Sequence, residues 1–186
     1  SGSGDGGDVT ITAGQSVSLT GNQSGIFSNT SGTGSAGNIT IAVDTLALNS
    51  RAQVQANTLP GSEGHGGNID VQVRAALLTG NSGIASNTLG SGDAGAIVIT
   101  AQDRISLTDS RMNSSTFAFP GKPEGGQGGQ ITLHAPTIDI SNSQIVSLSQ
   151  SSGSAGNVLL ETAHLTLDGS ELTASALSSG QGGDIT

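Results

Sequence analysis

Several residue types that usually stabilise or equip a small protein are missing or scarce in this chain of 186 residues. It contains no cysteine, tryptophan or tyrosine, and only three phenylalanines. Without cysteine, neither a disulfide framework nor a thiolate metal site can form. With so few aromatic side chains, the chain also lacks the large residues that dominate most mixed hydrophobic cores.

Basic residues and long apolar runs are scarce as well. Five Lys and Arg stand against 14 Asp and Glu, which gives a formal net charge of −9. Such a surface repels nucleic acid and anionic lipid, so we expect no nucleic-acid partner. No apolar run approaches the roughly twenty residues that cross a bilayer as a helix, so we expect no membrane insertion.

Glycine, by contrast, is abundant, and its spacing reveals an internal repeat. Each repeat glycine is followed by one polar or small residue and then by two alternating apolar residues, such as Ile39 and Ile41. The intervals between them are 30, 30, 28, 34, 27 and 27 residues. The repeat glycines are Gly7, Gly37, Gly67, Gly95, Gly129, Gly156 and Gly183.

Two further alternating pairs follow in every period, for example Leu46 with Leu48 and then Val54 with Ala56. Alternation over short runs indicates strands with one buried face, and hardly any stretch has a helical period. We therefore predict an all-β, right-handed parallel β-helix with three short strands in each of about six coils of 27–34 residues. The pattern covers residues 1–186 as one segment, which we expect to be an excerpt of a longer repeat protein.

The turns carry two predictions. Glycine-rich corners precede each coil, as in Ser152-Gly153-Ser154-Ala155, and we expect glycine to supply the positive φ of a sharp turn there. Asn29, Asn57 and Asn87 occupy equivalent positions after the third strand, which predicts a hydrogen-bonded ladder along the axis. Because Ser115, Leu148 and Ser175 follow at this position, we expect the ladder to end after three rungs.

One corner, residues 116–128, is larger than the others. It contains Phe117, Phe119 and Lys122, which is the chain's only lysine. Loops inserted into a solenoid often carry its binding surface, so these three residues are candidates for recognition. The alternative is a local cap, in which the two phenylalanines cover neighbouring corners.

No cofactor or metal is expected. His65, His134 and His164 are interpreted as surface histidines, since no carboxylate cluster accompanies them. Asp5 and Asp93 lie in sequences that loosely resemble a calcium-binding nonapeptide, but the pattern does not recur every nine residues, as rows of calcium ligands require.

Catalysis is not expected either. Solenoid enzymes that cleave acidic polysaccharides need carboxylates clustered on one strand face, often around calcium. Here Asp70 and Asp139 fall in separate outward rows, and no two adjacent coils present carboxylates in register on those rows. We therefore predict that the chain is not an enzyme. The alternative is a carbohydrate-active β-helix enzyme whose site lies outside residues 1–186.

The repeat carries a family resemblance. The motifs are Gly37-Asn38-Ile39-Thr40-Ile41, Gly67-Asn68-Ile69-Asp70-Val71 and Gly156-Asn157-Val158-Leu159-Leu160, with Ile-x-Ser-Asn-Thr at residues 84–88. This pattern resembles the repeat region of filamentous-haemagglutinin-like exoproteins, in the glycine-rich variant common in cyanobacteria. The resemblance implies a secreted rod, exported by two-partner secretion, that acts as an adhesin or fibre at the bacterial cell surface. The partners it implies are neighbouring coils, other copies associating laterally or end to end, and a cell-surface or glycan ligand.

Overall fold

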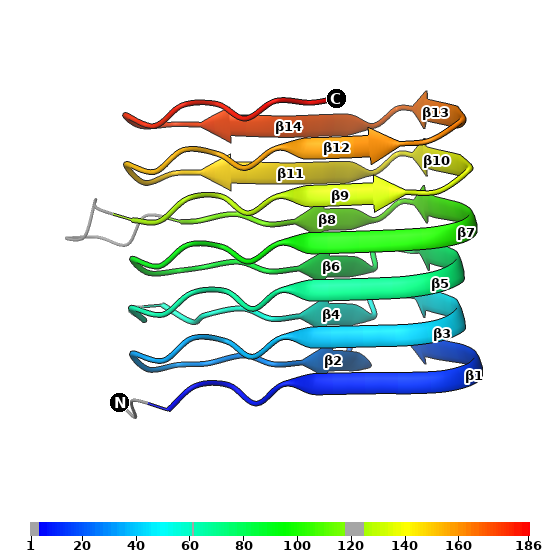
Figure 1. The fold of residues 1–186 in the computed structure, drawn as a ribbon, viewed down its shortest axis with the longest axis horizontal. Coiled ribbons are helices and arrows are strands. Elements are labelled where there is room, and N and C mark those ends of the chain that lie inside the picture. The colour runs from blue at the N-terminus through cyan, green and yellow to red at the C-terminus, as the bar shows by residue number, and fades with distance from the viewer. Residues whose placement is uncertain (1–3, 61, 118–124) are drawn as a thin grey trace.

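The computed structural model describes residues 4–60, 62–117 and 125–186. All regular secondary structure in these residues is β-strand, and the chain winds into a parallel β-solenoid of about six turns (Figure 1). The predicted all-β parallel solenoid is thereby confirmed. The described residues include no helix long and apolar enough to cross a membrane.

The first sheet contains the first two apolar pairs of every coil. In the first four coils both pairs lie in one long strand, and in the last two coils each pair has a strand of its own. Pro136 follows β9 and donates no backbone hydrogen bond, which accounts for the break in the fifth coil. The strands are β1 (Val9–Thr20), β3 (Ile39–Asn49), β5 (Ile69–Thr79), β7 (Ile97–Thr108), β9 (Ile131–His134), β10 (Thr137–Ser141), β12 (Val158–Glu161) and β13 (His164–Asp168).

The second sheet contains the third apolar pair and has six strands, one from each coil. Each strand pairs in parallel with the equivalent strand of the next coil, so that Ile84, for example, lies between Val54 and Met112. The strands are β2 (Gly25–Phe27), β4 (Gln53–Gln55), β6 (Gly83–Ala85), β8 (Arg111–Asn113), β11 (Gln144–Ser149) and β14 (Glu171–Ala176).

The core lies between the two sheets. Inward side chains such as Ile41, Leu48 and Ile84 are fully buried, because residues of similar shape lie directly above and below them. In the last coil, by contrast, Leu165 and Leu167 are 45% and 47% exposed, since β13 pairs on one side only. Burial therefore depends on the stacking of coils rather than on any single coil.

The corner glycines do not act through positive φ, and that prediction is wrong. The described glycines with positive φ are Gly21, Gly80 and Gly169, which lie at the opposite turn, where the chain passes from the first sheet to the second. The repeat glycines instead allow neighbouring coils to approach closely. A Cβ added to Gly67 would collide with the carbonyl oxygen of Gly37. The same clash recurs along the column from Gly37 to Gly183.

Candidate functional site: polar rows and a groove on the second sheet

The ends of the enlarged corner belong to the regular stack. Thr116 is buried and forms parallel bridges with Thr88 and Ser149. The half-buried Phe117 donates its backbone N–H to the Thr88 carbonyl at 2.9 Å. Phe119 and Lys122 lie outside the described residues, so both interpretations of this corner remain predictions.

The asparagine row joins four successive coils through side-chain acceptors. The Oδ1 atom of Asn29 accepts the backbone N–H of Asn57 at 2.9 Å, and that of Asn57 accepts the N–H of Asn87 at 2.7 Å. Asn87 Oδ1 then accepts the N–H of Ser115 at 3.0 Å. In each of these bonds a backbone N–H donates to a side-chain oxygen. A corner N–H that does not bond to a backbone carbonyl of a neighbouring strand needs another acceptor, and the side chain supplies it.

The predicted end of this row after three asparagines is wrong. The Ser115 hydroxyl accepts the backbone N–H of Leu148 at 3.1 Å, so the row continues for one more coil. A serine oxygen replaces the amide oxygen because only an acceptor at the right height is needed.

A second row of hydrogen bonds was not predicted from the sequence. It joins the residues that directly follow the repeat glycines in successive coils. Asp8 Oδ1 accepts the Asn38 N–H at 2.7 Å, and Asn38 Oδ1 accepts the Asn68 N–H at 2.9 Å. Asn68 Oδ1 in turn accepts the Ala96 N–H at 2.8 Å. The recurrence of Asp or Asn directly after a repeat glycine was the signal available in the sequence.

A third row contains Asp5 and Asp93, the two residues in the calcium-like sequences, together with one histidine. Asp5 Oδ1 accepts the Ser35 N–H, and Ser35 Oγ accepts the His65 N–H. His65 Nδ1 accepts the Asp93 N–H at 3.0 Å, and Asp93 Oδ1 accepts the Gln127 N–H at 2.7 Å. These atoms already serve the backbone. Among the described residues, no group of three or more His, Cys, Asp or Glu is placed to hold a metal.

The other two histidines, His134 and His164, lie on different strands of the first sheet. His134 Nδ1 lies 3.1 Å from Glu161 Oε2, directly across the parallel pair β9–β12. His164 is on β13 and exposed. Glu161 could not be predicted from the sequence, because the partner of His134 is decided by register between coils and not by proximity in sequence.

An ion-pair column crosses three coils on the outer side of the first sheet. Arg74 donates from Nε to Asp44 Oδ1 at 2.9 Å and from Nη1 to Asp103 Oδ2 at 2.8 Å. The hydrogen bond from Arg74 is the main cause that lowers the pKa of Asp44. The same two carboxylates raise the pKa of Arg74, with the hydrogen bond to Asp44 as the larger cause.

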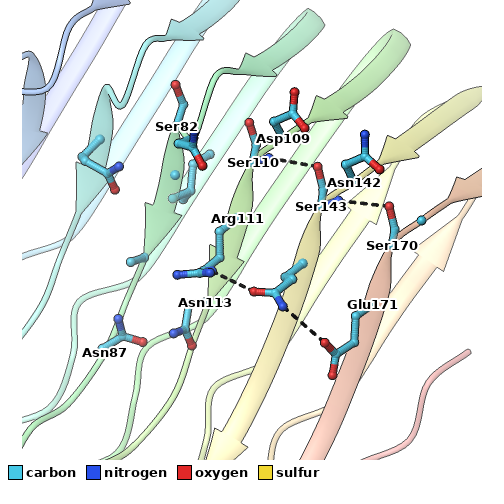
Figure 2. Close-up of a pocket in the computed structure, with 17 residues that line it drawn as sticks. Ser82, Asn87, Asp109, Ser110, Arg111, Asn113, Asn142, Ser143, Ser170 and Glu171 are labelled. Carbon is cyan, nitrogen blue, oxygen red and sulfur yellow. Dashed lines mark hydrogen bonds between the residues drawn. The ribbon is translucent and has the colours of Figure 1, made fainter.

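A hollow lies on the outer face of the second sheet, beside the turn that leads into it (Figure 2). We call it the polar groove; its volume is about 590 Å³. Its side chains come from five consecutive coils, from Gln53 on β4 to Glu171 on β14. Arg111 Nε donates to Gln144 Oε1 at 3.0 Å, and Gln144 Nε2 donates to Glu171 Oε2 at 3.3 Å. The groove therefore offers fixed amide, guanidinium and carboxylate groups in a line along the axis.

This groove was not predicted from the sequence. Its outward residues lie on either side of the inward apolar residue of each third strand. Because their residue types vary from coil to coil, they form no repeating pattern in the sequence. Comparison of the chain with family models, curated proteins and solved structures finds no match.

Proposed function

We propose that this chain is a structural and adhesive segment of an extracellular fibre and is not an enzyme. The observation that supports the proposal is the continuity of stacking. Successive coils are joined by two parallel sheets and, at many of the corners, by rows of side-chain acceptors. A solenoid whose units each bond to their neighbours forms a stiff rod, which suits a stalk that holds a binding surface away from a cell.

We further propose that the coils wind right-handed around three faces, and that the protein is exported by two-partner secretion. The handedness rests on the preference of parallel crossovers. The export route rests on the Gly-Asn-Ile-x-Ile resemblance described above. The partners we propose are other copies of the rod and a ligand on a cell surface.

Antibodies against this chain, applied to intact and to permeabilised cells of the producing organism, test the location. We expect labelling of intact cells or of the culture medium. Labelling that requires permeabilisation would contradict an extracellular fibre.

The enzymatic alternative is tested separately. The purified chain is incubated with acidic and neutral polysaccharides, and polymer length is followed by size-exclusion chromatography. We expect no change in length. Shortening of any polymer by this chain would overturn the non-catalytic proposal.

A further inference from the structure

The outer face of the second sheet presents two columns of side chains that follow the solenoid axis. Each column has one residue per coil, and neighbouring coils are about 4.8 Å apart. The first column is Gly25, Gln53, Gly83, Arg111, Gln144 and Glu171. The second is Phe27, Gln55, Ala85, Asn113, Val146 and Thr173.

The polar groove is deepened by small residues on β6. Gly83 and Ala85 leave β6 with nothing larger than a methyl group on its outward side. Gln53 leans over this space, since a Cβ on Gly83 would lie 2.9 Å from Gln53 Oε1. On the side of the turn, the exposed Asn81 and Asp109 line the groove. The groove is therefore bounded by polar groups rather than by apolar surface.

The polar groups of the groove are held in place. The chain of hydrogen bonds from Arg111 through Gln144 to Glu171 is drawn in Figure 2 and occupies only the Nε atom of Arg111. Within the described residues, no carboxylate forms an ion pair with Arg111, so its terminal nitrogens remain available as donors. Side chains ordered before binding lose less entropy when a ligand arrives.

An exposed aromatic ring continues the line of the groove in the first coil. Phe27 is 48% exposed, and its ring lies over Gly25, where no side chain intervenes. A ring in this position presents an apolar face to solvent next to Gln53 and Gln55. The apolar C–H face of a sugar ring packs against such a surface, while its hydroxyl groups remain free for the amides.

The chemistry of the groove selects among polymers. The groove contains both donors and acceptors, such as Arg111 and Glu171, and a hydroxyl group matches both because it donates one bond and accepts others. The net charge of −9 disfavours a polyanion. A peptide would gain main-chain bonds only at a free strand edge, and β4, β6, β8 and β11 are each paired on both sides.

We propose that this face binds a neutral polysaccharide that lies parallel to the solenoid axis. The sugar ring at one end packs on Phe27, and the hydroxyl groups bond to Gln53, Arg111 and the side chains beyond. From Gln53 to Glu171 the line covers four steps of the stack, or about 19 Å, which is long enough for several sugars. The inference rests on the proposed adhesive function and names the class of its ligand.

Isothermal titration of the whole chain with soluble oligosaccharides tests this proposal. The probes are fragments of cellulose, xylan, mannan and starch, with fragments of polygalacturonate as the anionic comparison. We expect at least one neutral probe to bind more tightly than polygalacturonate. Absence of binding to every neutral probe, or tighter binding of polygalacturonate, would overturn the proposal.

Three variants locate the site. Arg111→Ala removes a donor, Phe27→Ala removes the ring, and Gly83→Gln fills the hollow with the side chain that Gln53 and Gln144 already carry in this column. For each, we expect Kd to rise by about tenfold, a usual cost of one lost polar or aromatic contact. The matched control is Arg104→Ala on the first sheet, where Arg104 is exposed; its Kd should equal that of the unaltered chain.

Equal weakening by Arg111→Ala and Arg104→Ala would place binding elsewhere and overturn the assignment to the groove. Because Arg111 and Phe27 are exposed, these two variants keep the test valid even if Gly83→Gln lowers stability. The result of the binding test can be distinguished from the result of the labelling test of the proposed function. Surface labelling without glycan binding removes only this inference, whereas labelling confined to permeabilised cells removes the extracellular fibre.

Discussion

Arg74 holds both carboxylate oxygens of Asp44 in the preceding coil, with Nε 2.9 Å from Oδ1 and Nη2 3.0 Å from Oδ2. Two parallel bonds of this kind fix the geometry of an ion pair more strongly than a single contact. Since Arg74 also reaches Asp103 in the following coil, one side chain ties three coils together on the outer surface.

This ion pair predicts a pH-dependent contribution to stability. Arg74 favours the charged form of Asp44 only in the folded protein, so the pKa of Asp44 is lower when folded than its ordinary value of 3.8. The contribution is therefore present above about pH 4 and is lost as the pH falls through the lower folded pKa. Arg74→Met should lower the urea midpoint of unfolding near neutral pH and have a smaller effect at strongly acidic pH.

The control for this prediction is Arg104→Met, which removes an exposed arginine that forms no ion pair with the residues that the structure describes. Urea unfolding followed by circular dichroism gives both midpoints. A difference between Arg74→Met and the unaltered chain that stays constant from neutral to acidic pH would contradict the assignment of the effect to Asp44.

The stacked glycines predict a steep penalty for a single methyl group. In Gly67→Ala the new Cβ collides with the Gly37 carbonyl, and the backbone of the two coils must separate. Overpacking of this kind costs about 1–3 kcal/mol, so the melting temperature should fall by several degrees. Gly14→Ala is the matched control, since no atom of the described residues, apart from Gly14 and its two chain neighbours, lies within 4 Å of a Cβ there. Equal losses in both variants would show that loss of glycine itself, rather than the contact, sets the penalty.

The asparagine row predicts that only an acceptor is required. Asn57→Ala leaves the Asn87 N–H without its 2.7 Å partner and should cost about 0.5–1.5 kcal/mol of unfolding free energy. Asn57→Ser should recover part of the loss, because Ser115 already performs this role in a later coil. Hydrogen exchange at the Asn87 amide reports the change directly. Unchanged exchange in Asn57→Ala would mean that the side-chain bond contributes nothing there.

Thr58 and Thr88 lie in one inward column, and replacing either by valine keeps the shape of the side chain while removing its hydroxyl group. The two variants together test how much the hydroxyl hydrogen bonds contribute to stability. Thr88 Oγ1 donates to the Asp93 carbonyl at 2.8 Å and accepts the Gly66 N–H at 3.1 Å, whereas the buried Thr58 Oγ1 has no hydrogen-bond partner among the described residues. Thr88→Val should therefore cost about 0.5–1.5 kcal/mol, since it removes two side-chain hydrogen bonds while the Gly66 N–H keeps its 2.9 Å bond to the Asp93 carbonyl. Thr58→Val should be neutral or stabilising by denaturant unfolding. A loss of stability in Thr58→Val as large as that in Thr88→Val would indicate a water bound at Thr58.

Much of the architecture was predictable from particular residues. Ile39 with Ile41, Leu46 with Leu48 and Val54 with Ala56 identified the three inward pairs of a coil, because alternation specifies which face is buried. The boundaries between strands were not predictable from the pairs alone. Continuity of the long strands depends on whether the backbone between two pairs bonds to the coils on either side, and Pro136 interrupts that bonding.

The candidate sites were less predictable, since they depend on which residues of different coils lie at the same height. Asn29, Asn57 and Asn87 could be aligned because their spacing follows the repeat. The pairing of His134 with Glu161 could not be predicted in this way, and neither could the polar groove, because neither feature recurs from coil to coil. The groove in particular needs the small residues Gly83 and Ala85 next to long side chains in neighbouring coils.

The sequence by itself determined that this protein is a parallel β-solenoid, and it did so through the Gly-x-Ile-x-Ile spacing. A two-residue period and a thirty-residue period can be satisfied together only by stacking equivalent strands. Tertiary structure decided why the repeat glycines are needed, since the clash of Gly67 with Gly37 exists only between coils. It also decided where a ligand could lie, because the polar groove consists of side chains that are about thirty residues apart in the chain and one strand spacing apart in space.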